Sequence, residues 1–289
     1  MLTRRQYLLL LTPVSLLVVP FLLGPLVVAL TASFTDYGPA QSGGIHFVGL
    51  TNYEAVLGDR QVDLALRNAA VWLLVGVPAE LGLGFALAWW LRRPFRGRGW
   101  LRVVLLLPWL LSPVGSGVMW HFLYQSRIGL FDFALTWLGL EPLPSPLASP
   151  ELALWATLLT EVWRKAPLAS FLLLPGLLAV PSELWEQATL DGAPLATTVT
   201  HVALPWLRPL VLTIGLLLVA DSLGTFEQVL MLTGGGPGGQ TMLPGLYSYR
   251  EAFRSFNWST GATSALLIAG GVLIIGLSYL AVVRQEREP

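Results

Sequence analysis

Glu186-Gln187-Ala188-Thr189-Leu190-Asp191-Gly192-Ala193, followed eleven residues on by Leu204-Pro205, lies between two long apolar runs. The joining segment, 181–205, is polar and acidic, and His201 is its only possible cation. A short connection on the inner side of a membrane is normally basic, because anionic lipid attracts Lys and Arg. The segment is therefore either a solvated helical hairpin between two spans or a docking element for another protein.

The composition is that of a membrane protein. Hydrophobic residues make up 54% of the chain and charged residues 12%, about half the charged share of soluble domains. The mean hydropathy is +0.66, so lipid is the expected solvent for most of the surface. The net charge is zero, which argues against nucleic acid as a partner. Cysteine is absent, which excludes disulfides and thiolate metal sites.

Apolar runs of about 20 residues or more are long enough to cross a hydrocarbon core of roughly 30 Å as helices. They predict an all-α polytopic membrane protein with about six transmembrane helices in a single domain, residues 1–289. Pro108 and Pro113 interrupt the third run. The first run also resembles a secretory signal, but it is too long for an ordinary one, so we expect an uncleaved helix. The expected spans are 8–32, 69–90, 103–124, 152–180, 207–232 and 262–283.

The arginines predict the orientation. Five of them, Arg92, Arg93, Arg96, Arg98 and Arg102, lie between the second and third runs. Cytoplasmic connections carry the excess of Lys and Arg, so this connection is expected inside. Both termini and the segment 181–205 are then cytoplasmic as well.

Local signals divide the segment 181–205 into two short helices. Ser182 is a plausible N-cap, and Trp185 and Ala188 then fall on one face of a helix. Asp191-Gly192 predicts a turn, and Pro194 suits the first turn of a second helix.

The fourth run contains three charges, on Glu161, Arg164 and Lys165. On insertion scales these cost roughly 8 kcal/mol, whereas the apolar side chains of the run return only about 6 kcal/mol. The charges must therefore line a water-filled path or pair with acids on other helices. They form a polar wall of a substrate path, or else a structural ion pair or a charge that snorkels to the outer interface. The candidates for the path are Glu80, Trp163, Arg164, Lys165, Asp221 and Glu227.

No catalytic arrangement is visible. The only lysine, Lys165, is followed by Ala, so the chain has no phosphate-binding GxxxxGK[ST] loop. The glycine-rich stretch 234–239 lacks a lysine and is better explained as a tight turn. The three histidines lack ligand spacing and no nucleophile triad is apparent. We expect neither an enzyme nor a metal site, with any ATP hydrolysis on another chain.

Several segments together resemble a known family. The stretch 186–193 with Leu204-Pro205 resembles the cytoplasmic "EAA" loop of binding-protein-dependent ABC importer permeases. The likeness is strongest to the first permease subunit of carbohydrate importers of the maltose and glycerol-phosphate type. Gln187 stands where the loop usually has Ala, and Glu80 where a neutral residue is common. The other matching segments are Phe47-Val48-Gly49-Leu50-Thr51-Asn52-Tyr53, Arg67-Asn68, Leu107-Pro108-Trp109, Val118-Met119-Trp120, Trp163 with Pro167, and Leu232-Thr233-Gly234-Gly235-Gly236-Pro237-Gly238.

The resemblance implies a permease subunit in a bacterial plasma membrane that forms half of a pore. Its expected partners are a second permease, two ATPase subunits and an extracytoplasmic solute-binding protein, in a lipid bilayer. ATP and Mg²⁺ would bind the ATPase subunits, and this chain itself would bind no cofactor. The cargo would be a sugar or a related polyol or glycerol phosphate. ATPase docking is expected at Glu186, Gln187, Ala188, Asp191, Gly192 and Ala193. Contact with the binding protein is expected at Gly234, Gly235, Gly236 and Pro237.

Two other functions are weighed against this one. A proton-coupled secondary transporter acting without an ATPase would use Glu80, Asp221 or Glu227, but no internal repeat between residues 1–145 and 146–289 supports it. A membrane-embedded enzyme ranks last, because no acid–base or metal cluster is recognisable.

Overall fold

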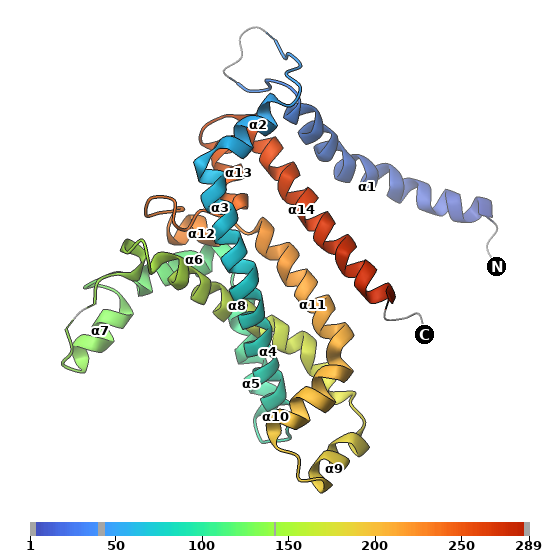
Figure 1. Cartoon of the computed structure of the whole chain (residues 1–289), viewed down its shortest axis with the longest axis vertical. Helices are drawn as coiled ribbons and strands as arrows, with labels where there is room; N and C mark the ends of the chain where they lie inside the picture. Colours follow the sequence, from blue (N-terminus) through green and yellow to red (C-terminus); the bar gives the residue numbers. More distant parts are fainter. Residues whose placement is uncertain (1–3, 40–43, 142, 286–289) are drawn as a thin grey trace. The chain divides into compact units, whose positions relative to one another are not determined.

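The computed structural model describes residues 4–39, 44–141 and 143–285. In these residues the chain is helical apart from loops, and its β-structure is one isolated bridge between Thr35 and Phe47. The chain divides into two compact units, Met1–Val62 with Tyr247–Gly270 and Asp63–Leu246 with Gly271–Pro289. The helices are labelled in Figure 1.

The first unit contains α1 (Arg4–Ser33), α2 (Thr51–Gly58), most of α13 (Pro244–Phe253) and the first part of α14 (Trp258–Gln285). Its polar contacts join segments far apart in sequence. The Asn52 side-chain amide donates to the carbonyls of Ser33 and Thr35, at 2.9 and 2.8 Å. These bonds satisfy carbonyls that the end of α1 leaves without helical partners.

The second unit holds the remaining helices. They are α3 (Arg60–Val71), the π-helical turn η1 (Trp72–Gly76), α4 (Val77–Leu91), α5 (Arg98–Leu110), α6 (Pro113–Leu123), α7 (Leu130–Trp137), the 3₁₀ turn η2 (Pro146–Ala148), α8 (Ala153–Leu178), α9 (Ser182–Leu190), α10 (Leu195–Thr198), the π-helical turn η3 (Val199–Ala203), α11 (Leu204–Gly224) and α12 (Glu227–Leu232).

The packing of α4 along α8 forms the centre of this unit. Glu80, Gly84 and Ala88 follow one another on α4 at four-residue intervals, which places them on one stripe. Gly84 lets the two helices approach closely: a Cβ added there would lie 2.6 Å from the Ala169 Cβ. Small residues at such a stripe are how helices in membranes pack tightly.

Three described helices are long and apolar enough to cross a membrane: Arg60–Leu91, Leu195–Gly224 and Trp258–Ser278. Counting each of two bent helix pairs as one span gives up to five. In α1 the described apolar part is Val18–Ser33. The count of about six spans therefore stays a prediction.

The expected third span, 103–124, is not one helix. It is divided into α5 and α6, which meet at an angle of 92°. Ser112 is extended and caps α6, because its hydroxyl accepts from the Gly115 amide at 3.1 Å. Pro113 then occupies the first turn of α6, where its missing N–H costs nothing. The break thus follows from the two residues that start a new helix.

The expected fifth span, 207–232, is displaced along the sequence. The helix that crosses starts at Leu195 and ends at Gly224. Thr225 is extended and ends α11, and residues 227–232 form the separate α12. Pro205 lies in the first turn of α11, and the π-helical turn η3 just before it joins α10 to α11.

Candidate functional site

The acidic segment forms a short helix closed by a glycine. Gly192 follows α9 with φ +65°, the left-handed conformation that favours glycine. Its amide donates to the Thr189 carbonyl at 3.1 Å, and the Ala193 amide donates to the Ala188 carbonyl at 2.9 Å. This pair of bonds is a Schellman motif, which ends a helix sharply. The turn predicted at Asp191-Gly192 is thereby explained.

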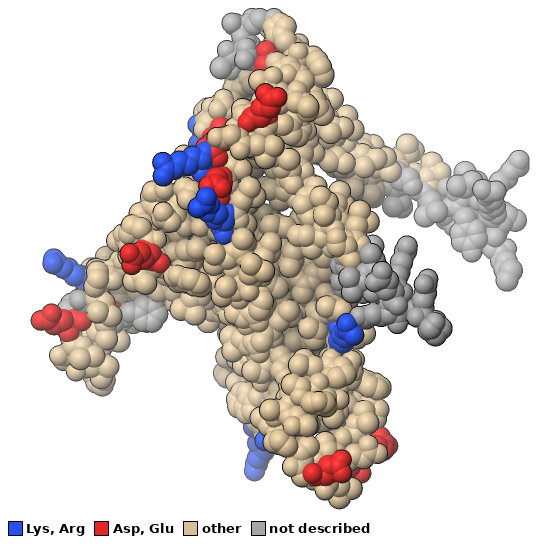
Figure 2. All heavy atoms as spheres, in the orientation of Figure 1, with Lys and Arg blue, Asp and Glu red and all other residues tan. Residues whose placement is uncertain are grey.

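The start of α9 differs from the expectation. Pro181 takes the N-cap position, Ser182 is the first helical residue, and no side chain caps the helix. None of the residues of α9 is buried, and Leu190 is 86% exposed. Figure 2 shows acidic side chains at the place where α9 is labelled in Figure 1.

Aromatic and cationic side chains attach α9 to the end of α4. The Arg92 guanidinium lies over the Trp89 ring, 3.8 Å from its centroid, and over the Trp185 ring, 4.1 Å from its centroid. The two rings meet edge to face with centroids 5.6 Å apart. Burial, followed by repulsion from Arg93, lowers the pKa of Arg92, although an arginine stays charged at neutral pH. We call these three residues the Trp–Arg–Trp clamp.

Two more arginines of this connection bind the end of α4. Arg98 Nη1 donates to the Arg92 carbonyl and Arg102 Nη2 to the Leu91 carbonyl, each at 3.4 Å. Cations are favourable at a helix C-terminus, where the last carbonyls lack helical partners. The arginine cluster therefore has a structural role at the end of α4.

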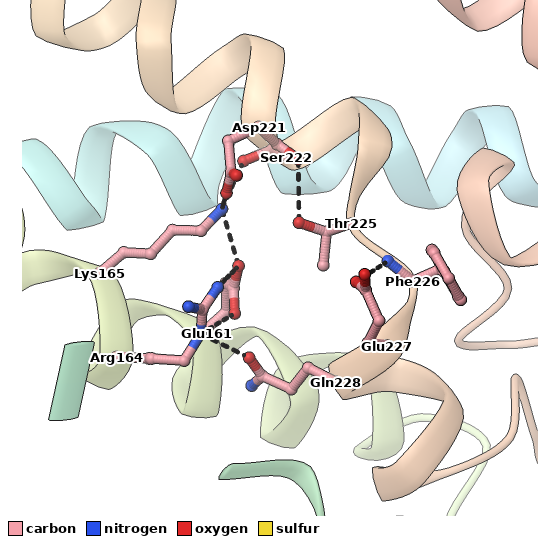
Figure 3. Close-up of polar contacts among 9 residues, drawn as sticks. All are labelled: Glu161, Arg164, Lys165, Asp221, Ser222, Thr225, Phe226, Glu227 and Gln228. Atoms are coloured by element: carbon pink, nitrogen blue, oxygen red, sulfur yellow. Dashed lines mark hydrogen bonds and ion pairs between the residues drawn. The ribbon is translucent and has the colours of Figure 1, made fainter. Parts of the chain in front are cut away.

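A buried polar cluster connects α8 with α11 and α12 (Figure 3). The Glu161 carboxylate contacts Lys165 Nζ at 2.7 Å and Arg164 Nη2 at 3.1 Å. Lys165 Nζ also lies 2.6 Å from Asp221 Oδ2 on α11. Arg164 Nε donates to Gln228 Oε1 on α12 at 2.9 Å. The two carboxylates of Glu161 and Asp221 thus balance the two cations, so this group has no net charge.

One side of the cluster lies at the surface of the chain. The side chains of Glu161 and Lys165 are 0% and 3% exposed, whereas that of Asp221 is 61% exposed. A buried ion pair must be well hydrogen-bonded to offset its desolvation. Here Ser222 Oγ, 3.3 Å from Lys165 Nζ, supplies a further bond. The predicted pairing of helix-four charges with Asp221 is present.

The other expected path residues lie differently. Glu80 is fully buried on α4, and neither of its carboxylate oxygens has a hydrogen-bond partner. Glu227 does not join the cluster in Figure 3, and its carboxylate accepts a hydrogen bond from the Phe226 amide at 3.5 Å. Trp163 meets Trp120 on α6 edge to face, with centroids 5.3 Å apart. Gln228 and Ser222 were not expected at this site, because both lie outside any recognised motif.

The glycine-rich turn is held by side chains of its own unit. Gly234 and Gly235 have φ of +62° and +88°. Thr241 Oγ1 lies 2.7 Å from Thr233 Oγ1 and donates to the Gly236 carbonyl at 2.8 Å. Asn68 Nδ2 on α3 donates to the Met242 carbonyl at 2.8 Å. These bonds explain why Asn68 accompanies the glycines in the sequence pattern.

Replacing Asn68 with Ala is expected to lower the free energy of unfolding by about 1–2 kcal/mol, because the buried Met242 carbonyl loses a donor. Replacing the exposed neighbour Arg67, whose ion pair with Asp63 lies at the surface, should change it by less than about 0.5 kcal/mol. Denaturation in detergent measures both, and equal losses would contradict the assigned role of Asn68.

Comparisons with known proteins agree with this architecture. Residues 62–287 match the family described as "Binding-protein-dependent transport system inner membrane component". The trehalose/maltose transport system permease protein MalF of Thermococcus litoralis is 35% identical over 245 residues, covering 84% of this chain and 81% of the relative. The trehalose transport system permease protein SugA of Mycobacterium tuberculosis is 30% identical over 278 residues, covering 96% of this chain and 88% of the relative.

The fold is shared with a solved transporter. One chain of a bacterial alginate ABC transporter, in complex with an alginate-bound periplasmic protein, superposes with a TM-score of 0.81 at 20% identity. The match covers 99% of this chain and 96% of that chain. The fold is therefore that of ABC transporter permeases. The chain belongs to the binding-protein-dependent transport system inner membrane component family.

Proposed function

We propose that the chain is a pore-forming subunit of an ATP-driven importer for a sugar or a related polyol or glycerol phosphate, and that α9 docks onto an ATPase subunit. The observation that carries the proposal is α9 itself. It is acidic, has no buried residue, ends in a Schellman turn at Gly192, and follows a bend of 83° from α8. A simple linker between spans needs no such projecting, capped helix.

The names of the relatives support the cargo class. They include permeases of trehalose/maltose and sn-glycerol-3-phosphate systems. No such support exists for a proton-coupled transporter. The other proposed partners of the chain are a second permease, a second ATPase subunit and a solute-binding protein that contacts Gly234–Pro237. ATP and Mg²⁺ act on the ATPase subunits, and both termini of this chain lie in the cytoplasm of a bacterial cell.

Co-purification in mild detergent tests the docking step. Replacing both Glu186 and Gln187 with Arg reverses one charge of α9 and adds another. This double variant is expected to lower the recovery of the ATPase at least about tenfold, which corresponds to about 1.4 kcal/mol. Both side chains are exposed on α9, so the permease should still insert. Glu54→Arg, on the exposed surface of α2, is the matched control. Unchanged ATPase recovery from the α9 variant would contradict docking through this helix.

Reconstitution tests the energy source and the cargo. Proteoliposomes with both permeases and the ATPase are expected to take up labelled trehalose, maltose or glycerol 3-phosphate only when ATP and the binding protein are present. Uptake by this chain alone, driven by a pH gradient without ATP, would instead establish the secondary transporter.

A further inference from the structure

The connection between α8 and α9 is a potential hinge. Only Ala179, Val180 and Pro181 separate the two helices, which are bent by 83°. Hinges are a few residues at the ends of elements that absorb large changes in backbone angles. A force applied to α9 would be lost at this hinge unless a second contact held the helix against the membrane unit.

The Trp–Arg–Trp clamp supplies a second contact. Trp185 belongs to α9, whereas Trp89 and Arg92 belong to the end of α4. All three are partly buried. The rings of Trp89 and Trp185 also pack against the apolar core that α4, α8 and α11 share. A partly buried guanidinium that lies over two indole rings is a favourable cation–π contact, and it opposes the separation of α9 from α4.

The element at the other end of the clamp is rigid. Gly84 and Ala88 lie on the buried face of α4. At Gly84, α8 is so close that no larger side chain would fit. Arg98 and Arg102 hold the last carbonyls of α4. α9 is thus joined to α8 by the chain and to α4 by the clamp, while α4 and α8 are themselves closely packed. Two attachments to one rigid pair fix the angle of α9.

We propose that the Trp–Arg–Trp clamp is a strut that transmits the displacement of α9 to the α4–α8 pair. Arg92 and Trp185 are then positioning residues for transport. The inference rests on the proposed docking of α9 to an ATPase. The α4–α8 pair carries Glu80 and the polar cluster, so motion imposed on α9 reaches the charged groups within the membrane.

Distance measurements test the strut directly. The chain has no cysteine, so spin labels can be placed at Glu183→Cys on α9 and Leu83→Cys on α4, both exposed positions. In the reconstituted complex the distance between them should be narrow and equal without nucleotide and with trapped ATP. In Arg92→Gln and in Trp185→Leu it should broaden and change with nucleotide. A narrow, unchanged distribution in both variants would overturn the proposal.

The ratio of transport to ATP hydrolysis provides the functional readout. Arg92→Gln and Trp185→Leu are expected to keep the ATPase bound and active but to lower maltose uptake per ATP about tenfold. Arg92→Lys keeps a cation and should restore part of the ratio. Trp90→Leu is the control, because Trp90 is an exposed neighbour stacked on Phe95. It should leave the maltose uptake per ATP unchanged.

The two proposals fail in different ways. If the wild-type chain recovers no ATPase, docking is refuted and the strut with it. If ATPase is recovered but both clamp variants keep the wild-type uptake ratio, only the strut is refuted. Should maltose not be carried by the wild-type complex, the spin-label distances still decide the outcome.

Discussion

Replacing Glu161 with Ala is expected to lower the free energy of unfolding by about 3–5 kcal/mol, the usual cost of removing one partner from a buried ion pair. Glu161 contacts both Arg164 and Lys165, and all three side chains are at most 8% exposed. After its removal Arg164 keeps Gln228, a neutral partner, and Lys165 keeps Asp221. Two buried cations would then share one carboxylate.

Thermal and denaturant unfolding of the purified chain in detergent measure this loss. Asp221→Asn is the matched control, since it also removes a carboxylate from Lys165 but at a side chain that is 61% exposed. We expect it to cost less than about 1 kcal/mol, because an ion pair at an exposed side chain contributes little. Losses of similar size in the two variants would contradict the division of the cluster into a buried half and an exposed half.

The same cluster allows a structural role to be separated from a role in the path. A buried ion-pair network replaced as a whole by apolar residues of similar size is often as stable as before. The triple variant Glu161→Leu, Arg164→Met, Lys165→Met should therefore insert and fold. If it also transports, the charges serve only packing. Loss of transport in a stable triple variant, together with loss in Asp221→Asn, would assign the cluster to the wall of the substrate path.

Sequence reasoning found the elements whose causes are local. The turn at Gly192 was predicted because few other residues adopt positive φ. Because charge in lipid needs a partner, the helix-four charges were expected to line water or to meet acids on other helices, and Lys165 does pair with Asp221. The division of 103–124 was signalled by Pro113, but the angle between the halves depends on how α6 packs against α12.

What the sequence could not predict depends on contacts between distant segments. The sequence explained Arg92 by the orientation of the chain and Trp185 by one face of a short helix, and it did not indicate that either residue contacts Trp89. Glu80 was expected to be a partner for the helix-four cations, yet its place on the tightly packed α4–α8 stripe keeps its oxygens without hydrogen bonds.

Replacing Gly84 with Leu is expected to disrupt the α4–α8 pair and to lower the free energy of unfolding by about 3 kcal/mol, the upper end for overpacking a close-packed interior. The first added atom already meets the Ala169 Cβ at 2.6 Å and the Ala166 carbonyl and Ser170 amide at 3.0 Å. Two of these three are backbone atoms, which cannot move aside without shifting α8. Separating the helices also removes the apolar contacts between them.

Gly82→Leu on the same helix is the matched control, because a Cβ at Gly82 meets nothing within 4 Å. Both variants gain the same helix propensity over glycine, about 0.8–1.0 kcal/mol, so their difference isolates the packing at α8. The difference in unfolding midpoint between the two variants measures this packing contribution. Equal midpoints would show that α4 and α8 separate freely, and would thereby remove the rigid pair on which the strut depends.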